Sequence, residues 1–419
     1  MCGIAGIFNV DGRPVDVGLL RAMTSAISHR GPDGDGFHVD GPVGLGHRRL
    51  AIIDLATGDQ PMRSADGTIA IVFNGELYNF RELRRDLEAR GAVFHTTSDT
   101  EVMLRAYEAW DVDCLARLRG MFAFVLWDGR RRRLFIARDR AGIKPMVYAW
   151  DGRRFLFASE IKALLQDPSL PREIRWSALG DYLTYHYVPG AQSIFCGIDK
   201  LPPASYLLLE ADGRGPEVRR YWDLRFAPDE TRAEADWRAE LAVRLEDAVR
   251  SHLVSDVPIG AFLSGGLDSS TVVAMMARAG ARPIRTFSIG FNESDFDELA
   301  YARLVARRFG TEHYEFVVKP AALEILPRLA WQFDEPFADA SALPTYYVSK
   351  ITREQVTVAL SGDGGDEGFA GYRRYATAMG LARQLDHGAG RLLRPLYRAA
   401  GRMLPAGARG QRYLELRGA

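Results

Sequence analysis

The chain begins with the stretch MCGIAGIFNV, residues 1–10, in which Cys2 directly follows the initiator methionine. The small and β-branched residues after Cys2 are typical of a buried β-strand. If Met1 is removed, Cys2 carries both a thiol and a free α-amine. The amine titrates near about 8 and the thiol near about 8.5, so the amine can accept the thiol proton at modest cost. Cys2 is therefore either a nucleophile with its own base or a small apolar residue that starts a buried strand.

A second stretch, AFLSGGLDSST at residues 261–271, interrupts an apolar run with glycines, an aspartate and hydroxyl groups. SGGLDSS, residues 264–270, is expected to follow a strand and to open a helix. Glycines let the backbone approach an anion, and the helix N-terminus presents unpaired N–H groups. The stretch differs from both GxxxxGK[ST] and GxGxxG. It predicts a phosphate-binding loop; the alternative is a glycine turn in which Asp268 or Ser269 caps the helix.

Composition excludes several classes of protein. The 419 residues are too many for one ordinary core, so two domains are expected. Lys+Arg and Asp+Glu are equal at 54 each, which gives no electrostatic support for a nucleic-acid partner. The three cysteines, Cys2, Cys114 and Cys196, indicate reduced thiols and a cytoplasmic protein. The longest apolar run, residues 121–127, is far shorter than a membrane span.

The pattern along the chain changes once. Residues 1–210 combine short apolar strands with two amphipathic helical stretches, which predicts an α+β domain. Residues 211–233 are rich in glycine, proline and charge, and we interpret them as a linker. From 234 to 419, helices alternate with strands, which predicts an α/β domain with a parallel sheet. Ligands in such sheets bind beyond the carboxyl ends of the strands, where SGGLDSS is expected to lie.

The first domain also offers groups that could bind an amino-acid amide. In FNGELYN, residues 73–79, the Asn74 side chain and the Gly75 N–H could donate to an oxyanion, although Asn-Gly is also a common hairpin turn. Arg49 could bind a carboxylate, and Glu76 and Asp99 an ammonium group. The alternatives are that Arg49 is a surface charge and that Ser98 or Asp99 caps a helix.

Seven motifs occur together in the first domain: MCGIAGIF, HRGPDG, HRRLAIIDL, FNGELYN, SDTEV, GMFAF and ARDRAGIKP. In this order they resemble the glutamine amidotransferase domain, of the N-terminal-nucleophile (Ntn) hydrolase type, found in asparagine synthetases. The resemblance implies a four-layer αββα sandwich with Cys2 as nucleophile and Asn74 and Gly75 as the oxyanion hole. It also implies four residues that hold glutamine: Arg49, Asn74, Glu76 and Asp99.

Motifs of the second domain, among them SDVPIGAFLSGGLDSS, DEPFADASALPTYYVS and LSGDGGDEGFAGY, resemble the synthetase domain of the same family, an ATP pyrophosphatase. The resemblance implies that Asp268 and Asp366 bind Mg²⁺. It implies that ATP is bound by Leu263, Ser264, Gly265, Gly266, Asp268, Ser269, Ile289, Ser361 and Gly362. In this family ATP adenylates a carboxylate, by default aspartate, and ammonia from glutamine displaces AMP after passing through an internal channel. Met121 and Ile143 match channel positions.

Three questions stay open at the level of sequence. The acceptor could be another carboxylate, or the synthetase half could be silent and hold ATP only as a ligand. The family motifs that follow in relatives are absent, Lys350 is the last lysine, and the final 45 residues form an amphipathic helical pattern. We therefore expect an incomplete synthetase domain beside a complete glutaminase domain. A homodimer is compatible with the sequence.

Overall fold

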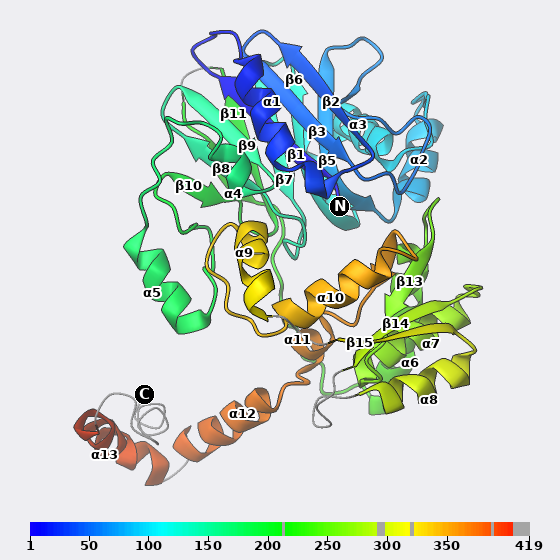
Figure 1. Ribbon diagram of the computed structural model, residues 1–419, viewed down its shortest axis with the longest axis vertical. Helices are drawn as coiled ribbons and strands as arrows, with labels where there is room; N and C mark the ends of the chain where they lie inside the picture. Colours follow the sequence, from blue (N-terminus) through cyan, green and yellow to red (C-terminus); the bar gives the residue numbers. More distant parts are fainter. Residues whose placement is uncertain (212–213, 291–297, 319–321, 387–388, 405–419) are drawn as a thin grey trace.

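The computed structural model describes residues 1–211, 214–290, 298–318, 322–386 and 389–404. Its first domain holds two six-stranded sheets, and its second holds one four-stranded sheet (Figure 1). Residues 212–213 of the expected linker lie outside the described residues, as do residues 291–297, 319–321, 387–388 and 405–419 of the expected second domain. Among the described residues, no helix combines the length and the apolar character needed to cross a bilayer.

The first sheet is antiparallel, in the order β10-β8-β9-β1-β3-β2. The N-terminal stretch that opens the sequence forms one of its central strands, as its small and β-branched residues predict. The strands are β1 (Gly3–Asn9), β2 (Gly34–Asp40), β3 (Val43–Arg49), β8 (Val147–Trp150), β9 (Arg154–Ala158) and β10 (Ile198–Lys200).

The second sheet is also antiparallel, in the order β12-β11-β7-β6-β5-β4. Its outermost strand β12 lies within the segment expected to be a linker, where it pairs with β11. The strands are β4 (Met62–Arg63), β5 (Ile69–Leu77), β6 (Gly120–Asp128), β7 (Arg133–Arg138), β11 (Ser205–Glu210) and β12 (Glu217–Arg220). Residues 129–132 form the turn from β6 to β7, and Arg133 is the first residue of β7.

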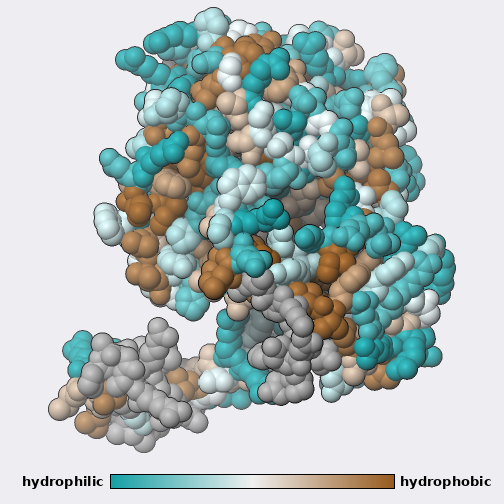
Figure 2. All heavy atoms as spheres, viewed as in Figure 1, coloured by the Kyte–Doolittle hydropathy of each residue, from teal (hydrophilic) through white to brown (hydrophobic). Residues whose placement is uncertain are grey.

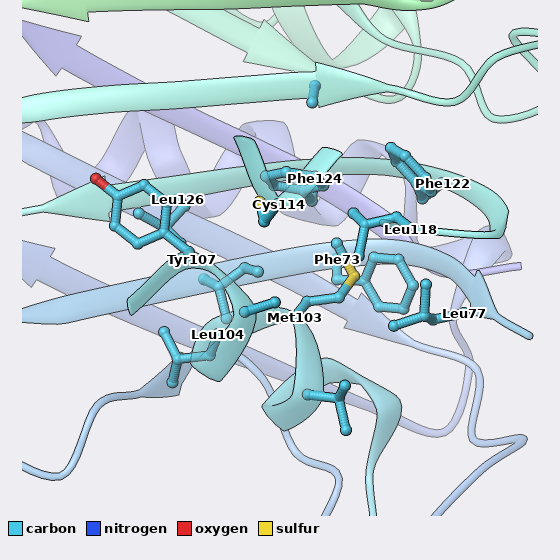
Figure 3. Close-up of a cluster of buried hydrophobic side chains, with 14 of the residues drawn as sticks. Phe73, Leu77, Met103, Leu104, Tyr107, Cys114, Leu118, Phe122, Phe124 and Leu126 are labelled. Carbon is cyan, nitrogen blue, oxygen red and sulfur yellow. The ribbon is translucent and has the colours of Figure 1, made fainter. Parts of the chain in front are cut away.

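Three cores separate the layers of this domain. Inward-facing side chains of both sheets, such as Ile4, Leu45 and Val72, form the core between them. Outside the first sheet lie α1 (Val17–Ala26) and α4 (Ile161–Leu164). Outside the second lie α2 (Phe80–Ala89) and α3 (Asp99–Trp110), whose apolar side chains meet Phe73 and Phe124 (Figure 3). The helix-sheet-sheet-helix order confirms the predicted four-layer αββα sandwich. The first domain also contains η1 (Ser28–Arg30), η2 (Asp111–Ala116) and α5 (Trp176–Tyr185).

The second domain is built on a parallel sheet in the order β15-β14-β13-β16, which confirms the predicted α/β class. Its strands are β13 (Ile259–Phe262), β14 (Arg285–Gly290), β15 (Glu312–Val317) and β16 (Val358–Leu360). A core of apolar side chains packs α6, α7 and α8 against the sheet. The helices are α6 (Glu234–His252), α7 (Leu267–Arg278), α8 (Leu299–Phe309), α9 (Ala322–Phe333), α10 (Ala342–Thr352), α11 (Gly365–Phe369), α12 (Arg373–Asp386) and α13 (Ala389–Met403). Helices α12 and α13 extend away from the other elements (Figure 1).

The two domains meet along a charged junction beside a hollow (Figure 2). Lys162 of the first domain lies in the junction, with its Nζ 3.0 Å from the Asp334 carboxylate and 4.5 Å from the centre of the Trp331 ring. Lys200 pairs with Glu335. The Ala338 amide donates to the His186 carbonyl over 2.8 Å. These contacts tie the segment between α9 and α10 to the first domain.

Candidate functional site

The sheet register brings the candidate residues of the first domain to one end of the sandwich. Side chains alternate along a strand, so residues two apart share a face. Cys2 precedes the inward-facing Ile4 by two residues, and Asn74 follows the inward-facing Val72 by two. On β3, His47 lies directly opposite Ile4. The residues that flank the apolar core at this end of β1, β3 and β5 are therefore Cys2, His47 and Asn74, whose side chains lie between the sheets.

Cys2 is held by backbone contacts on both sides. Its Sγ lies 3.4 Å from the Leu50 amide and 3.6 Å from the Leu50 carbonyl oxygen. Its own carbonyl accepts a hydrogen bond of 2.9 Å from Arg30, whose guanidinium also pairs with Glu160 at 2.7 Å. Burial raises the pKa of the Cys2 thiol, although the Leu50 amide bond opposes that shift. The thiol is therefore protonated at neutral pH and needs a base.

The terminal amine beside Cys2 is a weak base in this position. Burial lowers the pKa of the Met1 amine to about 5; the Cys2 thiol opposes that shift, whereas Arg30 and Lys144 add to it. The Lys144 Nζ lies 2.9 Å from the Met1 sulfur, and burial lowers the pKa of Lys144 to about 8. With Met1 in place, its amine is therefore uncharged at pH 7, beside a protonated Cys2 thiol.

Asn74 and Gly75 lie inside β5, opposite Ala123 and Phe122 of β6. The alternative interpretation of Asn-Gly as a hairpin turn is therefore wrong. A Cβ at Gly75 would lie 2.2 Å from the Met121 carbonyl oxygen, so only glycine fits this position. The Asn74 side chain is fully buried, and neither of its polar atoms has a partner among the described residues. Because an unpaired buried amide costs free energy, this side chain is suited to a ligand.

The edge of β5 explains how the Gly75 N–H becomes available. Strand β4 pairs with β5 only as far as Ile71. Beyond Ile71, side chains instead of a neighbouring strand accept hydrogen bonds from the backbone N–H groups at this edge. Gln60 accepts from the Phe73 N–H at 2.6 Å, and Asp99 accepts from the Leu77 N–H at 3.0 Å. The backbone groups of an antiparallel strand alternate between its two neighbours, so the Gly75 N–H faces the same edge, between these two bonds.

The acidic candidates lie close together. Burial raises the pKa of Glu76 well above its ordinary value, and the negative charge of the nearby Asp99 raises it further. Burial raises the pKa of Asp99 to about 6, although backbone hydrogen bonds from Leu77 and Thr100 oppose the shift. Ser98 is the helix cap, since its side chain accepts from the Thr100 amide. Asp99 is therefore left as a buried carboxylate at the start of α3.

Arg49 is not a free surface charge. Its guanidinium donates to the carbonyl oxygens of Asp54 at 2.5 Å and Leu55 at 3.2 Å, and it pairs with Asp59 at 2.8 Å. The side chain is 12% exposed, whereas that of Asp59 is 84% exposed. Asp59 can therefore turn to solvent and leave the fork of Arg49 to a substrate carboxylate.

Three residues of this site were not predicted from the sequence: Arg30, His47 and Lys144. Arg30 and Lys144 lie in the motifs HRGPDG and ARDRAGIKP, which mark their positions but not their roles. A buried lysine or arginine in a short motif is the signal that could have identified both. His47 is 1% exposed, and burial lowers its pKa to about 3. Nothing in the sequence distinguishes it from a surface histidine, because its burial depends on how the sheets stack.

The second candidate site lies at the carboxyl end of β13. Gly265 has φ +86°, and a Cβ there would lie 2.5 Å from the Ala302 amide nitrogen of α8. Ser269 accepts from the Ser264 N–H at 3.2 Å and lies 3.0 Å from the Ser264 hydroxyl. Gly266 is the N-cap of α7, with no side-chain cap. The alternative of a helix capped by Asp268 or Ser269 is therefore wrong, and the first N–H groups of α7 remain available.

A cavity of about 240 Å³ adjoins this loop. Leu263, Ser264 and Ile289 line it together with Phe287 and Val348. Its apolar walls and its position beside the glycine loop suit a purine and ribose. Ser361 and Gly362 follow the neighbouring strand β16, and a Cβ at Gly362 would lie 2.9 Å from the Asp268 Cβ. The structure thus brings the candidate ATP-binding residues together around one strand end.

The two proposed magnesium ligands also lie at this strand end. A Cβ at Gly365 would lie 2.2 Å from the Asp268 carboxylate, so this carboxylate reaches the loop that carries the next residue, Asp366. Among the residues that the structure describes, no three His, Cys, Asp or Glu side chains are grouped as a metal site. Two carboxylates beside a phosphate loop fit magnesium, which usually takes one or two protein ligands together with water and phosphate oxygens.

Comparisons with known proteins identify the family of each domain. Residues 1–222 match the family model described as a glutamine amidotransferase domain, and residues 240–417 match the one described as asparagine synthase. The chain belongs to the glutamine-hydrolysing asparagine synthetase family. It is 39% identical to asparagine synthetase [glutamine-hydrolyzing] 1 of Bacillus subtilis over 99% of this chain and 65% of that protein.

Two further relatives show how the family extends. A protein of Methanocaldococcus jannaschii, provisionally named as a second asparagine synthetase [glutamine-hydrolyzing], is 39% identical over 89% of this chain and 76% of its own length. Amidase chyE of Penicillium rubens is 33% identical over 89% of this chain and 59% of its own. The chain thus spans about two thirds of the length of the Bacillus relative.

Proposed function

We propose that this chain hydrolyses glutamine at Cys2 and passes the ammonia to a carboxylate that ATP has activated. The observation that carries the first half is the Asn74 amide, which is buried beside Gly75 with no partner in the described part of the chain, at the end of the sandwich where Cys2 lies. Sequence similarity to asparagine synthetases along nearly the whole chain supports the second half.

In the glutaminase reaction, the Cys2 sulfur attacks the carboxamide carbon of glutamine. The thiol proton passes to the terminal amine that removal of Met1 would expose, and then to the leaving nitrogen. The C–N bond breaks, ammonia leaves, and water hydrolyses the thioester to glutamate. The developing oxyanion accepts hydrogen bonds from the Asn74 amide and the Gly75 N–H.

Charged side chains of the same pocket would hold the two ends of the amino acid. The fork of Arg49 suits the α-carboxylate of glutamine, because a planar guanidinium matches it with two parallel hydrogen bonds. Glu76 and Asp99 suit the α-ammonium group. That cation would also offset the cost of keeping two carboxylates close together in a buried place.

In the second domain, a carboxylate oxygen would attack the α-phosphate of ATP and release pyrophosphate. Ammonia would then displace AMP from the acyl-adenylate. The 264–270 loop would hold the released pyrophosphate through its N–H groups and hydroxyls. When bound between Asp268 and Asp366, magnesium would neutralise phosphate charge. Aspartate is the acceptor that the names of the relatives suggest, with asparagine as product. Another carboxylate is the second candidate, since one relative is named an amidase.

A cavity of about 350 Å³ between the domains supports transfer of ammonia inside the protein. Arg30, which contacts the Cys2 carbonyl, lines it from the first domain, and Phe333 lines it from the second. Met121 lies opposite Glu76 on β6, and Ile143 is 57% exposed. We propose that ammonia leaves the glutamine site past these two residues.

The test separates the two halves of the proposal. Ammonia release from glutamine should fall at least about a thousandfold in Cys2→Ala and stay unchanged in Cys196→Ala, whose thiol lies outside the site. AMP formation with aspartate and ammonium chloride should survive both changes. Glutamine hydrolysis that persists in Cys2→Ala would disprove the nucleophile. Glutaminase activity without AMP formation from any carboxylate would indicate a silent synthetase half.

A further inference from the structure

Asp54 lies at the centre of the loop that holds Arg49. Its carbonyl accepts from the Arg49 guanidinium at 2.5 Å. Its carboxylate accepts from the Thr57 and Thr97 amides at 2.8 and 2.7 Å. Hydrogen bonds from these threonines lower the pKa of Asp54 to about 2, although its burial opposes the shift. One side chain thus connects the loop to the segment that leads into Asp99.

The second domain contributes to the same loop. The Asp256 carboxylate accepts from the Asp54 N–H at 2.7 Å. The Asp256 N–H in turn donates to the Ile52 carbonyl at 2.9 Å. These two bonds hold residues 52–54 from both sides. Asp54 itself has φ +55°, a backbone conformation that few residues other than glycine adopt without support.

Asp256 is close in sequence to the proposed ATP-binding loop. It lies three residues before β13, and β13 ends at Phe262, two residues before the Ser264 that opens the phosphate loop. A short, continuous piece of chain therefore runs from the proposed ATP loop to the backbone that holds Arg49. Other contacts across the junction, such as the 2.7 Å ion pair between Arg119 and Asp247, do not touch this loop.

We infer that Asp256 is a positioning residue for glutamine: from the ATP-binding domain it fixes the 52–54 backbone, which places Arg49 for the substrate carboxylate. This inference rests on the proposed function of the first domain. The glutamine site is then complete only when the second domain is docked. Loss of the bond from Asp54 should weaken glutamine binding more than it slows the chemical step, because Cys2, Asn74 and Gly75 are held by other contacts.

The test measures glutamine binding and turnover in Asp256→Ala, Asp256→Asn and the control Asp247→Ala. Asp247 also bridges the domains, so its loss reports domain docking alone. In Asp256→Ala we expect the KM for glutamine to rise about tenfold, with kcat within about twofold of wild type. Asp256→Asn keeps an oxygen that can accept from the Asp54 N–H and should restore most of the affinity. Asp247→Ala should resemble wild type.

Calorimetry of glutamine binding in a Cys2→Ala background keeps the inference testable even where hydrolysis is absent. The dissociation constant should rise about tenfold on adding Asp256→Ala and little on adding Asp247→Ala. Equal affinity in Asp256→Ala and wild type would overturn the inference, as would a loss of the same size in Asp247→Ala. Persistence of glutamine hydrolysis in Cys2→Ala would contradict the proposed nucleophile while leaving this result intact.

Discussion

His47 Nε2 lies 3.3 Å from the carbonyl oxygen of Phe73, one residue before Asn74. Since burial keeps the imidazole neutral, with a pKa near 3, Nε2–H can donate to this carbonyl at any pH where the enzyme is folded. His47 and Gln60 thus hold the two backbone groups of Phe73 at the open edge of β5.

The first prediction concerns this histidine. His47→Leu keeps a similar volume but leaves the Phe73 carbonyl without its donor, so the Asn74–Gly75 segment should be less well positioned. We expect kcat for glutamine hydrolysis to fall about tenfold, with a smaller change in KM. Steady-state ammonia release measures both constants. An unchanged kcat in a folded variant would show that β5 needs no support at this point.

The second prediction is a dependence of glutamine affinity on pH. Burial raises the pKa of Asp99 to about 6, so this carboxylate gains a proton and loses its charge as the pH falls through that value. Below that pH the KM for glutamine should rise, approaching a slope of about tenfold for each unit by which the pH falls. Asp99→Asn should show a high KM that depends less on pH, because Glu76, whose pKa is also raised, is the carboxylate that remains. A KM for wild type that stays constant from pH 8 to 5 would exclude Asp99 as an ammonium ligand.

The same carboxylate makes a matching prediction for stability. Its raised pKa stabilises the fold fully below the unfolded value of 3.8, and this contribution is lost as the pH rises through about 6. Bound glutamine would supply a cation to the charged form. The increase in Tm caused by saturating glutamine should therefore be larger at pH 7.5 than at pH 5. Scanning calorimetry of Cys2→Ala avoids turnover; an equal increase at both pH values would contradict the prediction.

The third prediction uses two glycines of the second domain. Gly265→Ala places a Cβ 2.5 Å from the Ala302 amide nitrogen at a residue with φ +86°, so the loop must move. ATP affinity should fall at least about tenfold, with some loss of stability. Gly368→Ala is the control, because no atom lies within 4 Å of the added Cβ and the site is helical. Tight ATP binding in Gly265→Ala would mean that this loop does not hold phosphate.

The fourth prediction concerns the charged junction between the domains. Lys162 is surrounded by Glu160, Asp334 and the Trp331 ring, with 11% of its side chain exposed. Lys162→Met removes the cation paired with the buried Asp334 carboxylate, while Glu160 keeps Arg30 as a partner, and should lower stability by about 3–5 kcal/mol. Thermal unfolding measures the loss. Arg220→Ala breaks a pair that is more than half exposed and should change Tm little; a similar small effect of Lys162→Met would show that water reaches the junction.

Much of the fold could be predicted from short-range patterns. The apolar run of residues 121–127 predicts β6, whose two faces are both buried between layers, and helical spacing of apolar residues predicts α2 and α3. Strand β12 lies in a segment of charges and glycines, and only its pairing with β11 makes it a strand. The arginine-rich β12 has no buried residue, so its sequence contains no sign of that pairing.

The candidate site divides in the same way. Cys2 stands out because its position at the chain start gives it a possible second reactive group. Asn74-Gly75 by itself favours a turn, since the sequence cannot show that the Met121 carbonyl of β6 would lie 2.2 Å from a Cβ at Gly75. His47 and Asp256 act through backbone atoms of Phe73 and Asp54, which are distant in sequence. Interactions of this kind depend on the packing of sheets and domains, which no local pattern records.

The polar side chains at one end of the sandwich follow the same alternation along each strand as the apolar side chains of the core. The site should therefore be sensitive to insertions within these strands. One residue inserted into β1 before Ile4, into β3 after Leu45 or into β5 after Val72 would turn the polar end of that strand to the opposite face of its sheet. The reactive side chains would then face the outer helices instead of one another, while most apolar side chains between the sheets would keep their positions. Such an insertion would yield a stable but chemically inert protein, whereas the loops around Gly12 and Gly152, where an added Cβ meets nothing, could lengthen without harm.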